Sequence, residues 1–314
     1  MPRETTKHHL GFLCLAILSL AAFRLPLTTL LSVSSQDDRD SHVLLILSIS
    51  AGLLYFGRES IFREPRFCLT WGLPLLLLGA VLCLTSQTPE WFSDQNDYLS
   101  YSTFSFVYVW VAAFVLSYGT KVLQASRFPL SFLVLMIPIP TVLLDRTIGF
   151  LQRASADVTH GLFEVAGVPV DWLGLGFVLR GSHFEIAKEC SGIHSSLILF
   201  VMSILAGHLF LRSLLAKVCF SVFTVFVAIF KNAVRVVTIA CLTAYVDGSF
   251  YDSWVHRKGG LIFGAFALAI LAPSLLALRK AESHFRPERP APGTKEDVTA
   301  EGRADCVSRD NEVA

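Results

Sequence analysis

The stretch CFSVFTVFVAIFKNAVRVVTIACLTAYV, residues 219–246, decides the fold class. It is mostly apolar and contains only two charged side chains, Lys231 and Arg235. A helix of about 20 apolar residues crosses roughly 30 Å of hydrocarbon, so we predict that this stretch spans a membrane. The whole chain is 53% hydrophobic and 16% charged, whereas soluble chains have about 25% charged residues. This composition excludes a water-soluble enzyme.

Similar apolar runs recur along most of the chain. They predict an all-α membrane protein of about eight transmembrane helices, near residues 10–31, 42–56, 68–86, 101–118, 128–146, 193–211, 218–246 and 261–278. Arg24 interrupts the first run, so we expect it to be retained and not cleaved as a signal peptide. We expect residues 1–280 to form one transmembrane domain. Residues 281–314, rich in Pro, Glu, Arg and Asp, are predicted to form a disordered cytoplasmic tail.

The distribution of Lys and Arg predicts the orientation of these helices. With the N-terminus inside, the inner segments carry eleven Lys and Arg and the short outer loops carry three. The positive-inside rule then favours both termini in the cytoplasm and loop 147–192 on the extracytoplasmic side. The chain has no dense basic stripe, so we expect the lipid bilayer, and not a nucleic acid, as a partner.

Loop 147–192 is the least membrane-like part of the predicted domain. An amphipathic helix on the outer membrane surface is predicted by the approximate helical spacing of Ile148, Leu151, Val158, Leu162 and Val165. The following stretch FVLRGSHFEIA, residues 177–187, partly alternates apolar and polar residues around a central Arg-Gly-Ser, which favours a short β-hairpin. This small extracytoplasmic insertion runs directly into the stretch ECSGIHSS, residues 189–196.

Charged residues inside a bilayer are functional candidates because their burial is costly. Arg235 lies roughly 16 Å below the predicted outer end of its span, at Val246, and we expect it to reach the outer interface by snorkelling. Asn232 is three residues earlier and shares its helix face. The alternative is a structural Arg that binds carbonyls or lipid phosphate.

Cys190 differs from the other six cysteines because its neighbours are polar. At the N-terminus of the sixth span, free backbone N–H groups and the helix dipole favour a thiolate and can stabilise an oxyanion. His256 precedes the eighth span and is a candidate general acid or base. An interfacial Cys is more often inert and a loop His usually only solvated. The topology nevertheless assigns Cys190, Arg235 and His256 to one membrane side, where they suffice for acyl transfer through a thioester.

A metal site is the alternative use of the polar residues near Cys190. Five side chains could contribute ligands, namely His183, Glu185, Glu189, Cys190 and His194. Their spacing matches no closed zinc pattern, and the seven cysteines contain no CxxC pair. We therefore expect neither a metal nor another cofactor.

Five motifs in order resemble the exosortase/archaeosortase family of membrane-embedded, sortase-like cysteine transpeptidases. They are FPLSFLVLMIPIP at 128–140, GVPV at 167–170, ECSGIHSS at 189–196, NAVRVV at 232–237 and VHRKGG at 255–260. The resemblance covers about residues 128–270, which would form the catalytic part, while the earlier spans agree only in being hydrophobic.

The resemblance implies a catalytic triad of Cys190, Arg235 and His256. His194 is a departure, since many bacterial members carry Arg at that position. The residues implied to bind substrate or to support the triad are Asn232, Ser191, Gly192 and His194.

The resemblance also implies the substrates and the location. The expected partners are exported, membrane-anchored proteins that carry a C-terminal sorting signal, made of a short PEP-CTERM-like motif, a transmembrane helix and a basic end. Cleavage would occur at the periplasmic side of the cell inner membrane, by a thiol protease or transpeptidase acting in exopolysaccharide and surface-protein production.

Two alternatives from other functional classes are a transporter and a silent assembly factor. In a transporter or channel, Lys231 and Arg235 would line a pathway for an anion. In a non-catalytic assembly factor for exopolysaccharide or surface-protein export, all three triad residues would be replaceable without effect.

Overall fold

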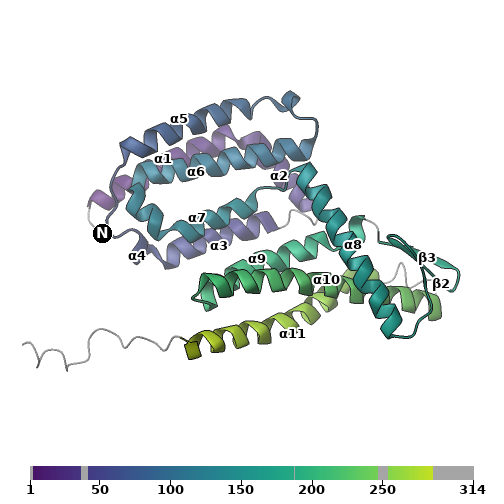
Figure 1. Cartoon of the computed structure of the whole chain (residues 1–314). Helices are drawn as coiled ribbons and strands as arrows, with labels where there is room; N and C mark the ends of the chain where they lie inside the picture. Colours follow the sequence, from purple (N-terminus) through teal and green to yellow (C-terminus); the bar gives the residue numbers. More distant parts are fainter. Residues whose placement is uncertain (1–2, 37–41, 187, 247–253, 286–314) are drawn as a thin grey trace, which may run out of the picture.

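The computed structural model describes residues 3–36, 42–186, 188–246 and 254–285, and most of them are helical (Figure 1). The side chains of Glu189, Cys190 and residues 254–259 lie outside the described part. The predicted tail at 286–314 also lies outside it, while residues 281–285 continue the last helix.

The first half of the chain forms a group of helices around a shared apolar core. The helices are α1 (Arg3–Ala22), α2 (Arg24–Gln36), α3 (His42–Phe56), α4 (Arg58–Ile61), α5 (Leu69–Thr85), α6 (Gln95–Ala125) and α7 (Arg127–Phe132), with 3-10 turns η2 (Pro89–Trp91) and η3 (Leu133–Met136). Figure 1 shows α1, α5 and α6 side by side, with α3 and α7 beneath them. Aromatic side chains fill the core, including Phe23, Phe106, Phe114, Tyr118 and Phe132.

The second half contains three long helices, α9 (Ile193–Phe210), α10 (Leu214–Tyr245) and α11 (Trp254–Phe285). α10 packs against α9 and α11, and both run antiparallel to it (Figure 1). The start of α1 and the end of α11 lie at one end of the molecule, and the β-strands lie at the other (Figure 1).

The described helices that could span a membrane can be compared with the predicted eight spans, and the count of eight stays a prediction. Four described helices, α6, α9, α10 and α11, are long and apolar enough to span a membrane, or six if each bent pair counts as one span. The first bent pair is α1 and α2, which meet at 69°. The predicted spans at 42–56 and 68–86 correspond to α3 and α5, apolar helices of 15 and 17 residues. The chain is thus a multi-pass membrane protein with spans of unequal length.

The predicted fifth span at 128–146 is wrong in its C-terminal part. The segment Arg127–Met136 ends before the Pro-Ile-Pro sequence, and α8 (Thr141–Val165) leaves at 85° to it. Pro138 and Pro140 have no backbone N–H and restrict the residue before each of them, so the helix stops before Pro138. Residues 141–146 therefore belong to α8, which lies across the end of the helix group in Figure 1.

The amphipathic helix is present, but its buried side differs from the predicted stripe. Val165 is 89% exposed, whereas the polar side chains of Gln152, Ser155 and Thr159 are buried next to Ile148 and Leu151. The reason is that this side packs against α10, α9 and η4 (Lys188–Ser191), and protein neighbours can accept or donate hydrogen bonds where lipid cannot.

A three-stranded antiparallel sheet follows α8, so the insertion has one strand more than a hairpin. Its strands are β1 (Asp171–Leu173), β2 (Gly176–Leu179) and β3 (Ser182–Glu185), and Phe177 pairs with Phe184. Buried side chains of β2 and β3 pack on α8 and on the last turns of α10, whereas the residues of β1 are exposed. The sheet therefore covers the same end of the bundle to which the ECSGIHSS segment leads.

Candidate functional site

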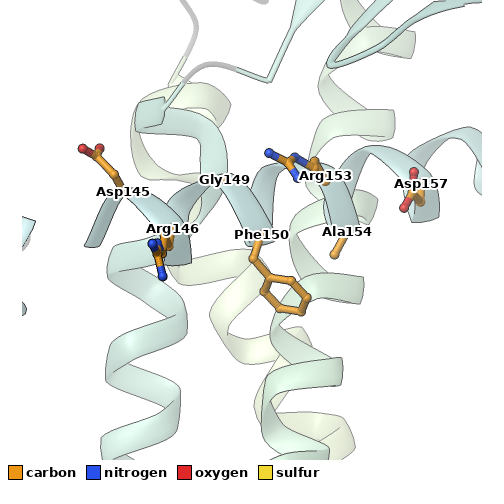
Figure 2. A pocket seen from close by; sticks show the side chains of 7 residues that line it. All are labelled: Asp145, Arg146, Gly149, Phe150, Arg153, Ala154 and Asp157. Carbon is orange, nitrogen blue, oxygen red and sulfur yellow. The ribbon is translucent and has the colours of Figure 1, made fainter. Parts of the chain in front are cut away.

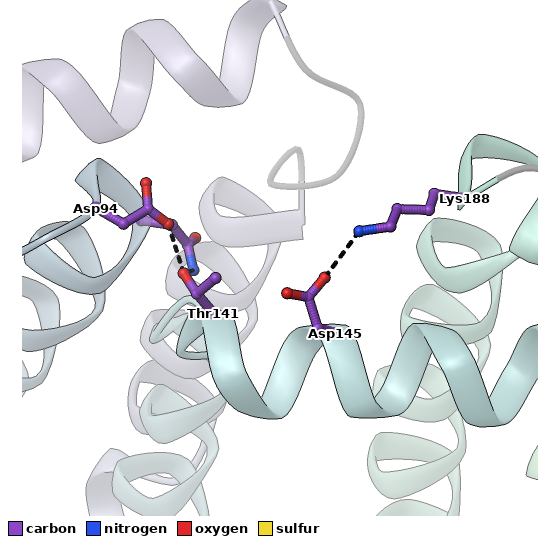
Figure 3. A network of polar contacts seen from close by, with 5 residues as sticks. Asp94, Thr141, Asp145 and Lys188 are labelled. Carbon is purple, nitrogen blue, oxygen red and sulfur yellow. Dashed lines mark hydrogen bonds and ion pairs between the residues drawn. The ribbon is translucent and has the colours of Figure 1, made fainter.

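The segment that carries Cys190 is held on α8 by contacts on both sides of Ala187, a residue outside the described part. Before it, Gln152 Nε2 on α8 donates a 2.7 Å hydrogen bond to the carbonyl of Ile186. After it, Lys188 Nζ lies 3.2 Å from Asp145 Oδ1 (Figure 3). The backbone of Cys190 then forms part of the 3-10 turn η4, which ends one residue before Gly192. The nucleophile candidate is thus held on a short turn between a sheet and a helix.

Gly192 directly precedes α9 and has a left-handed conformation, with φ of 74°. A Cβ atom at this position would lie 2.8 Å from Asn232 Oδ1 and 2.9 Å from Asn232 Cγ. Only glycine combines this φ with so close a neighbour. Asn232 is 1% exposed, and its Nδ2 donates a 3.1 Å hydrogen bond to Ser155 Oγ on α8. One asparagine of α10 therefore contacts both the start of α9 and the middle of α8.

Lys231, next to Asn232 on α10, joins the same segment through a second contact. Its side chain is 3% exposed, and Nζ donates a hydrogen bond to Ser195 Oγ. Ser195 Oγ in turn donates to the carbonyl oxygen of Gly192 at 3.1 Å, and Ser196 N donates to that oxygen at 2.9 Å. Two consecutive residues of α10 thus hold the start of α9. Asn232 contacts Gly192 at its Cα, and Lys231 acts on the Gly192 carbonyl through Ser195.

Arg235 lies on α10 one turn after Asn232 and is half-buried. The 32 residues of α10 extend about 48 Å, more than the roughly 30 Å of hydrocarbon. The later part of α10 is covered by the sheet, and Arg180 in the β2–β3 turn stacks 4.4 Å above the Tyr245 ring. Arg235 therefore does not need to snorkel toward Val246 as we expect from the sequence, because it already lies close to the level of α8.

The third predicted triad member, His256, is placed only by its backbone. It lies in the first turn of α11, which runs back along α10 from the end where α10 meets the sheet (Figure 1). Its side chain, like that of Cys190, is outside the described part. The backbone positions assign Cys190, Arg235 and His256 to the end of the bundle that carries the sheet.

The remaining predicted site residues surround the start of α9. Ser191 is 1% exposed, and its Oγ accepts a 3.4 Å hydrogen bond from Ile193 N. His194 is half-buried, and its Nδ1 is buried without a hydrogen-bond partner among the described residues. In the described part of the chain, no three His, Cys, Asp or Glu side chains are grouped so that they could hold a metal ion.

A hollow of about 550 Å³ lies on the side of α8 that faces away from Asn232. Its lining is Asp145, Arg146, Gly149, Phe150, Arg153, Ala154 and Asp157. Figure 2 shows the Phe150 ring on the side of α8 opposite to Asp145. A smaller hollow of about 370 Å³ continues from Arg153 and Asp157 to the β1–β2 turn at Gly174. Neither hollow lies between η4 and α10, so we do not assign the chemistry to them.

Polar contacts also fix the corner at which the chain turns into α8. Thr141 Oγ1 donates to Asp94 Oδ2 at 2.6 Å (Figure 3), and Thr141 N donates to Asp97 Oδ1 at 2.7 Å. The hydrogen bond from Thr141 lowers the pKa of the Asp94 carboxyl below its ordinary value. These bonds hold the start of α8 on the start of α6.

Sequence reasoning did not find three of the residues that position this site. Gln152 and Ser155 were missed because we expected the buried side of α8 to be apolar, although polar residues at i and i+3 within that stripe are a signal of contact with protein. Ser195 carries no signal by itself. Its role follows only from its contact with Lys231, which we had singled out as a charge inside a span.

Residues 33–273 match the model of the family described as Transmembrane exosortase (Exosortase_EpsH). No curated protein and no solved structure matches the chain. The matched region includes every described element from α3 to η4 and the α9–α10 contact. The resemblance predicted from the motifs is thereby confirmed, and the chain belongs to the transmembrane exosortase family.

Proposed function

We propose that this chain is a membrane cysteine transpeptidase that removes the C-terminal sorting signal of exported proteins through a thioester on Cys190. The observation that carries the proposal is the contact of Gly192 with Asn232, since it joins the turn that bears Cys190 to the helix turn that leads to Arg235. Membership in the transmembrane exosortase family supports the same proposed function.

The proposed reaction begins with a substrate helix beside α9, α10 and α11. The Cys190 thiolate attacks the scissile carbonyl carbon, and the oxyanion that forms is stabilised by Arg235 and by backbone N–H groups at the start of α9. The C–N bond then breaks, and His256 donates a proton to the leaving amine. An amine, a hydroxyl or water then attacks the resulting thioester and gives its proton to His256. The acyl group passes to this acceptor, and the Cys190 thiolate is restored.

We further propose that the site faces the periplasm and that both termini lie in the cytoplasm of a bacterial cell. Lys and Arg are concentrated in the segments assigned to the inside. The start of α1 and the end of α11 lie opposite the sheet, which agrees with this orientation (Figure 1). The basic end of a substrate would be held inside by the same charge rule.

The test uses the full chain in membranes and a reporter protein that ends in a transmembrane helix and an Arg-rich segment, taken from a neighbouring reading frame. Cys190→Ala and Cys190→Ser are expected to abolish cleavage of the reporter while the protein accumulates normally. Cys241→Ala, in the part of α10 that packs on the sheet, is the matched control and should cleave normally. Cleavage by Cys190→Ala at the normal rate would defeat the proposal.

The transport alternative makes a different prediction, because it needs Arg235 but not Cys190. The hydrogen bond of the buried Lys231 to Ser195 favours the enzyme, since it directs the ammonium group to the start of α9 and not along a pathway. Anion uptake into liposomes that is lost in Arg235→Gln and retained in Cys190→Ala would support transport. An assembly factor would tolerate Cys190→Ala, Arg235→Gln and His256→Ala without a phenotype.

A further inference from the structure

The buried ammonium group of Lys231 is not used by the proposed reaction. Its side chain is 3% exposed and lies inside a helix that spans the membrane. A buried charge is costly and is normally tolerated only with good hydrogen-bond partners. Lys231 lies in the part of α10 where α8, α9 and α10 meet, next to Asn232. A reason for this charge is therefore to be sought in what it contacts.

Its contacts form a short relay that ends at the turn after Cys190. Lys231 Nζ donates to Ser195 Oγ, and Ser195 Oγ donates to the Gly192 carbonyl. The hydroxyl of Ser195 can donate only one hydrogen, so a donor on its other side fixes the direction in which that hydrogen points. Lys231 supplies this donor, because an ammonium group has donors only. The Gly192 carbonyl therefore receives a hydroxyl hydrogen bond whose direction Lys231 sets.

The relay and the Asn232 contact act on the same glycine from two directions. Asn232 packs against the Cα of Gly192, where a Cβ would be 2.8 Å from its Oδ1, and the relay holds the carbonyl. Gly192 sets the direction of the first backbone N–H groups of α9, because it is the residue that precedes the helix. Those N–H groups are the ones expected to face the Cys190 sulfur and the oxyanion.

We infer that Lys231 is a positioning residue that, through Ser195, fixes the Gly192 turn and so aims the N-terminus of α9 at the reacting atoms of Cys190. The inference rests on the proposed function, because it assigns Lys231 a task in the chemistry of Cys190. It adds two residues to the site, Lys231 and Ser195, neither of which is a member of the proposed triad.

The first test needs no substrate and uses N-ethylmaleimide on the full chain in detergent. Mass spectrometry of the Cys190 peptide measures its alkylation rate separately from the other six cysteines. Because the thiolate is the reactive form and the start of α9 stabilises it, Lys231→Met and Ser195→Ala should each slow alkylation about tenfold. Ser195→Thr, which keeps the hydroxyl, should restore the rate. An unchanged or faster rate in Lys231→Met or Ser195→Ala would overturn the inference.

Two matched controls separate the relay from a general effect of substitution. Ser203 lies on α9, is 3% exposed and donates to the Phe200 carbonyl at 2.7 Å, the same spacing as Ser195 to Gly192. Among the described residues, Lys231 donates to Ser195 and not to Ser203. Ser203→Ala should therefore leave alkylation of Cys190 unchanged. Lys217→Met removes a partly exposed lysine from the same helix as Lys231 and should also have no effect. A loss of equal size in either control would contradict the relay.

The second test measures cleavage of the reporter described above. Lys231→Met should lower kcat about tenfold and change KM less than about twofold, because substrate binding is untouched. The double variant of Lys231→Met and Ser195→Ala should be no slower than the slower single variant, since the two residues act as one unit. Loss of activity only in proportion to loss of folded protein would overturn the inference in favour of a structural role.

The two proposals can fail separately. If Cys190→Ala abolishes cleavage while Lys231→Met and Ser195→Ala keep the normal kcat, the inference fails and the proposed function stands. If Cys190→Ala cleaves normally while the Lys231 and Ser195 variants slow alkylation of Cys190, the relay stands and the proposed function fails.

Discussion

Two antiparallel helix pairs, α5 with α6 and α9 with α10, are packed by different means. In the first pair, Gly72 lies so close to Leu116 that an added Cβ would be 2.5 Å from the Leu116 Cα, and Gly79 faces Val109 in the same way at 3.0 Å. In the second pair, a glycine again marks the close approach, but its neighbour is the amide of Asn232. Beside it, Lys231 donates to Ser195.

The difference separates packing that builds the fold from packing that builds the site. Small residues let two helix backbones approach in lipid, and this contact needs only shape. Hydrogen bonds between buried polar groups fix direction as well as distance, and they carry a large penalty if one partner is lost. We therefore expect substitutions in the α5–α6 pair to change stability, and substitutions at the start of α9 to change activity first.

The largest effect is expected for Gly192→Ala. The added methyl group would meet Asn232 and would occupy a left-handed conformation, so the turn after Cys190 must move. A displacement of about 1 Å can lower a catalysed rate about 100-fold, which is the loss we expect in reporter cleavage. Gly161→Ala in α8, where an added Cβ has no neighbour within 4 Å, should cleave normally. Full activity of Gly192→Ala would mean that the turn does not set the reactive geometry.

In the other helix pair, Gly72→Ala should mainly lower stability. Its Cβ would collide with the backbone of Leu116, and forcing an extra group into a tight contact costs about 1–3 kcal/mol. Thermal unfolding in detergent measures the loss, and Gly52→Ala, with open space around it, is the control. Cleavage per folded molecule should stay normal. A loss of activity without a loss of stability would remove the distinction between the two helix pairs.

A smaller effect is expected for Gln152→Ala, at the edge of the site. The substitution removes the hydrogen bond to the Ile186 carbonyl and leaves a buried acceptor unpaired, at a cost of about 1–3 kcal/mol. Because Ile186 precedes η4, we expect an added protease to cut this protein faster in the segment before Cys190. We also expect the rate at which the variant cleaves the reporter to fall a few-fold. Gln87→Ala removes an exposed glutamine far from the site and serves as control. Unchanged proteolysis in Gln152→Ala would show that α8 does not hold this segment.

The smallest effect concerns Asp94 and Thr141. Since the hydrogen bond from Thr141 lowers the pKa of Asp94, it stabilises the folded chain above the ordinary carboxyl pKa, and this contribution is lost as the pH falls through the lowered pKa. Thr141→Val should bring the pKa of Asp94 back toward its ordinary value and flatten the loss of stability on acidification. Thermal unfolding at several acidic pH values measures this, and an identical pH dependence in both proteins would exclude the assignment.

Most of the helices could be predicted from the sequence, because apolar length is a local property. The ends of the fifth span could not, since Met136 and Thr141 differ little from their neighbours and only the two prolines between them mark the break. The strand at Asp171–Leu173 was missed because all three of its residues are exposed, which gives no alternation of apolar and polar residues. The number of true spans depends on helix angles, which the sequence does not contain.

The candidate site was predicted in part for a related reason. Motif order marked Cys190, Arg235 and His256, and whether their reacting atoms meet stays a prediction. The contacts that join the motifs are long-range, as between Lys231 and Ser195 or Asn232 and Ser155, and no local pattern encodes them. Lys231 was recognised as unusual from its apolar surroundings alone, and its partner required the fold.

The most direct test of the central claim is to trap the acyl-enzyme. Full-length protein is incubated with the reporter in membranes, quenched in acid and analysed by mass spectrometry of its cysteine peptides. The account predicts a substrate fragment in thioester linkage on the Cys190 peptide, absent from Cys190→Ala. It also predicts less of this adduct in Arg235→Gln. Cleaved reporter together with an unmodified Cys190, or with the fragment on any of the other six cysteines, would contradict it.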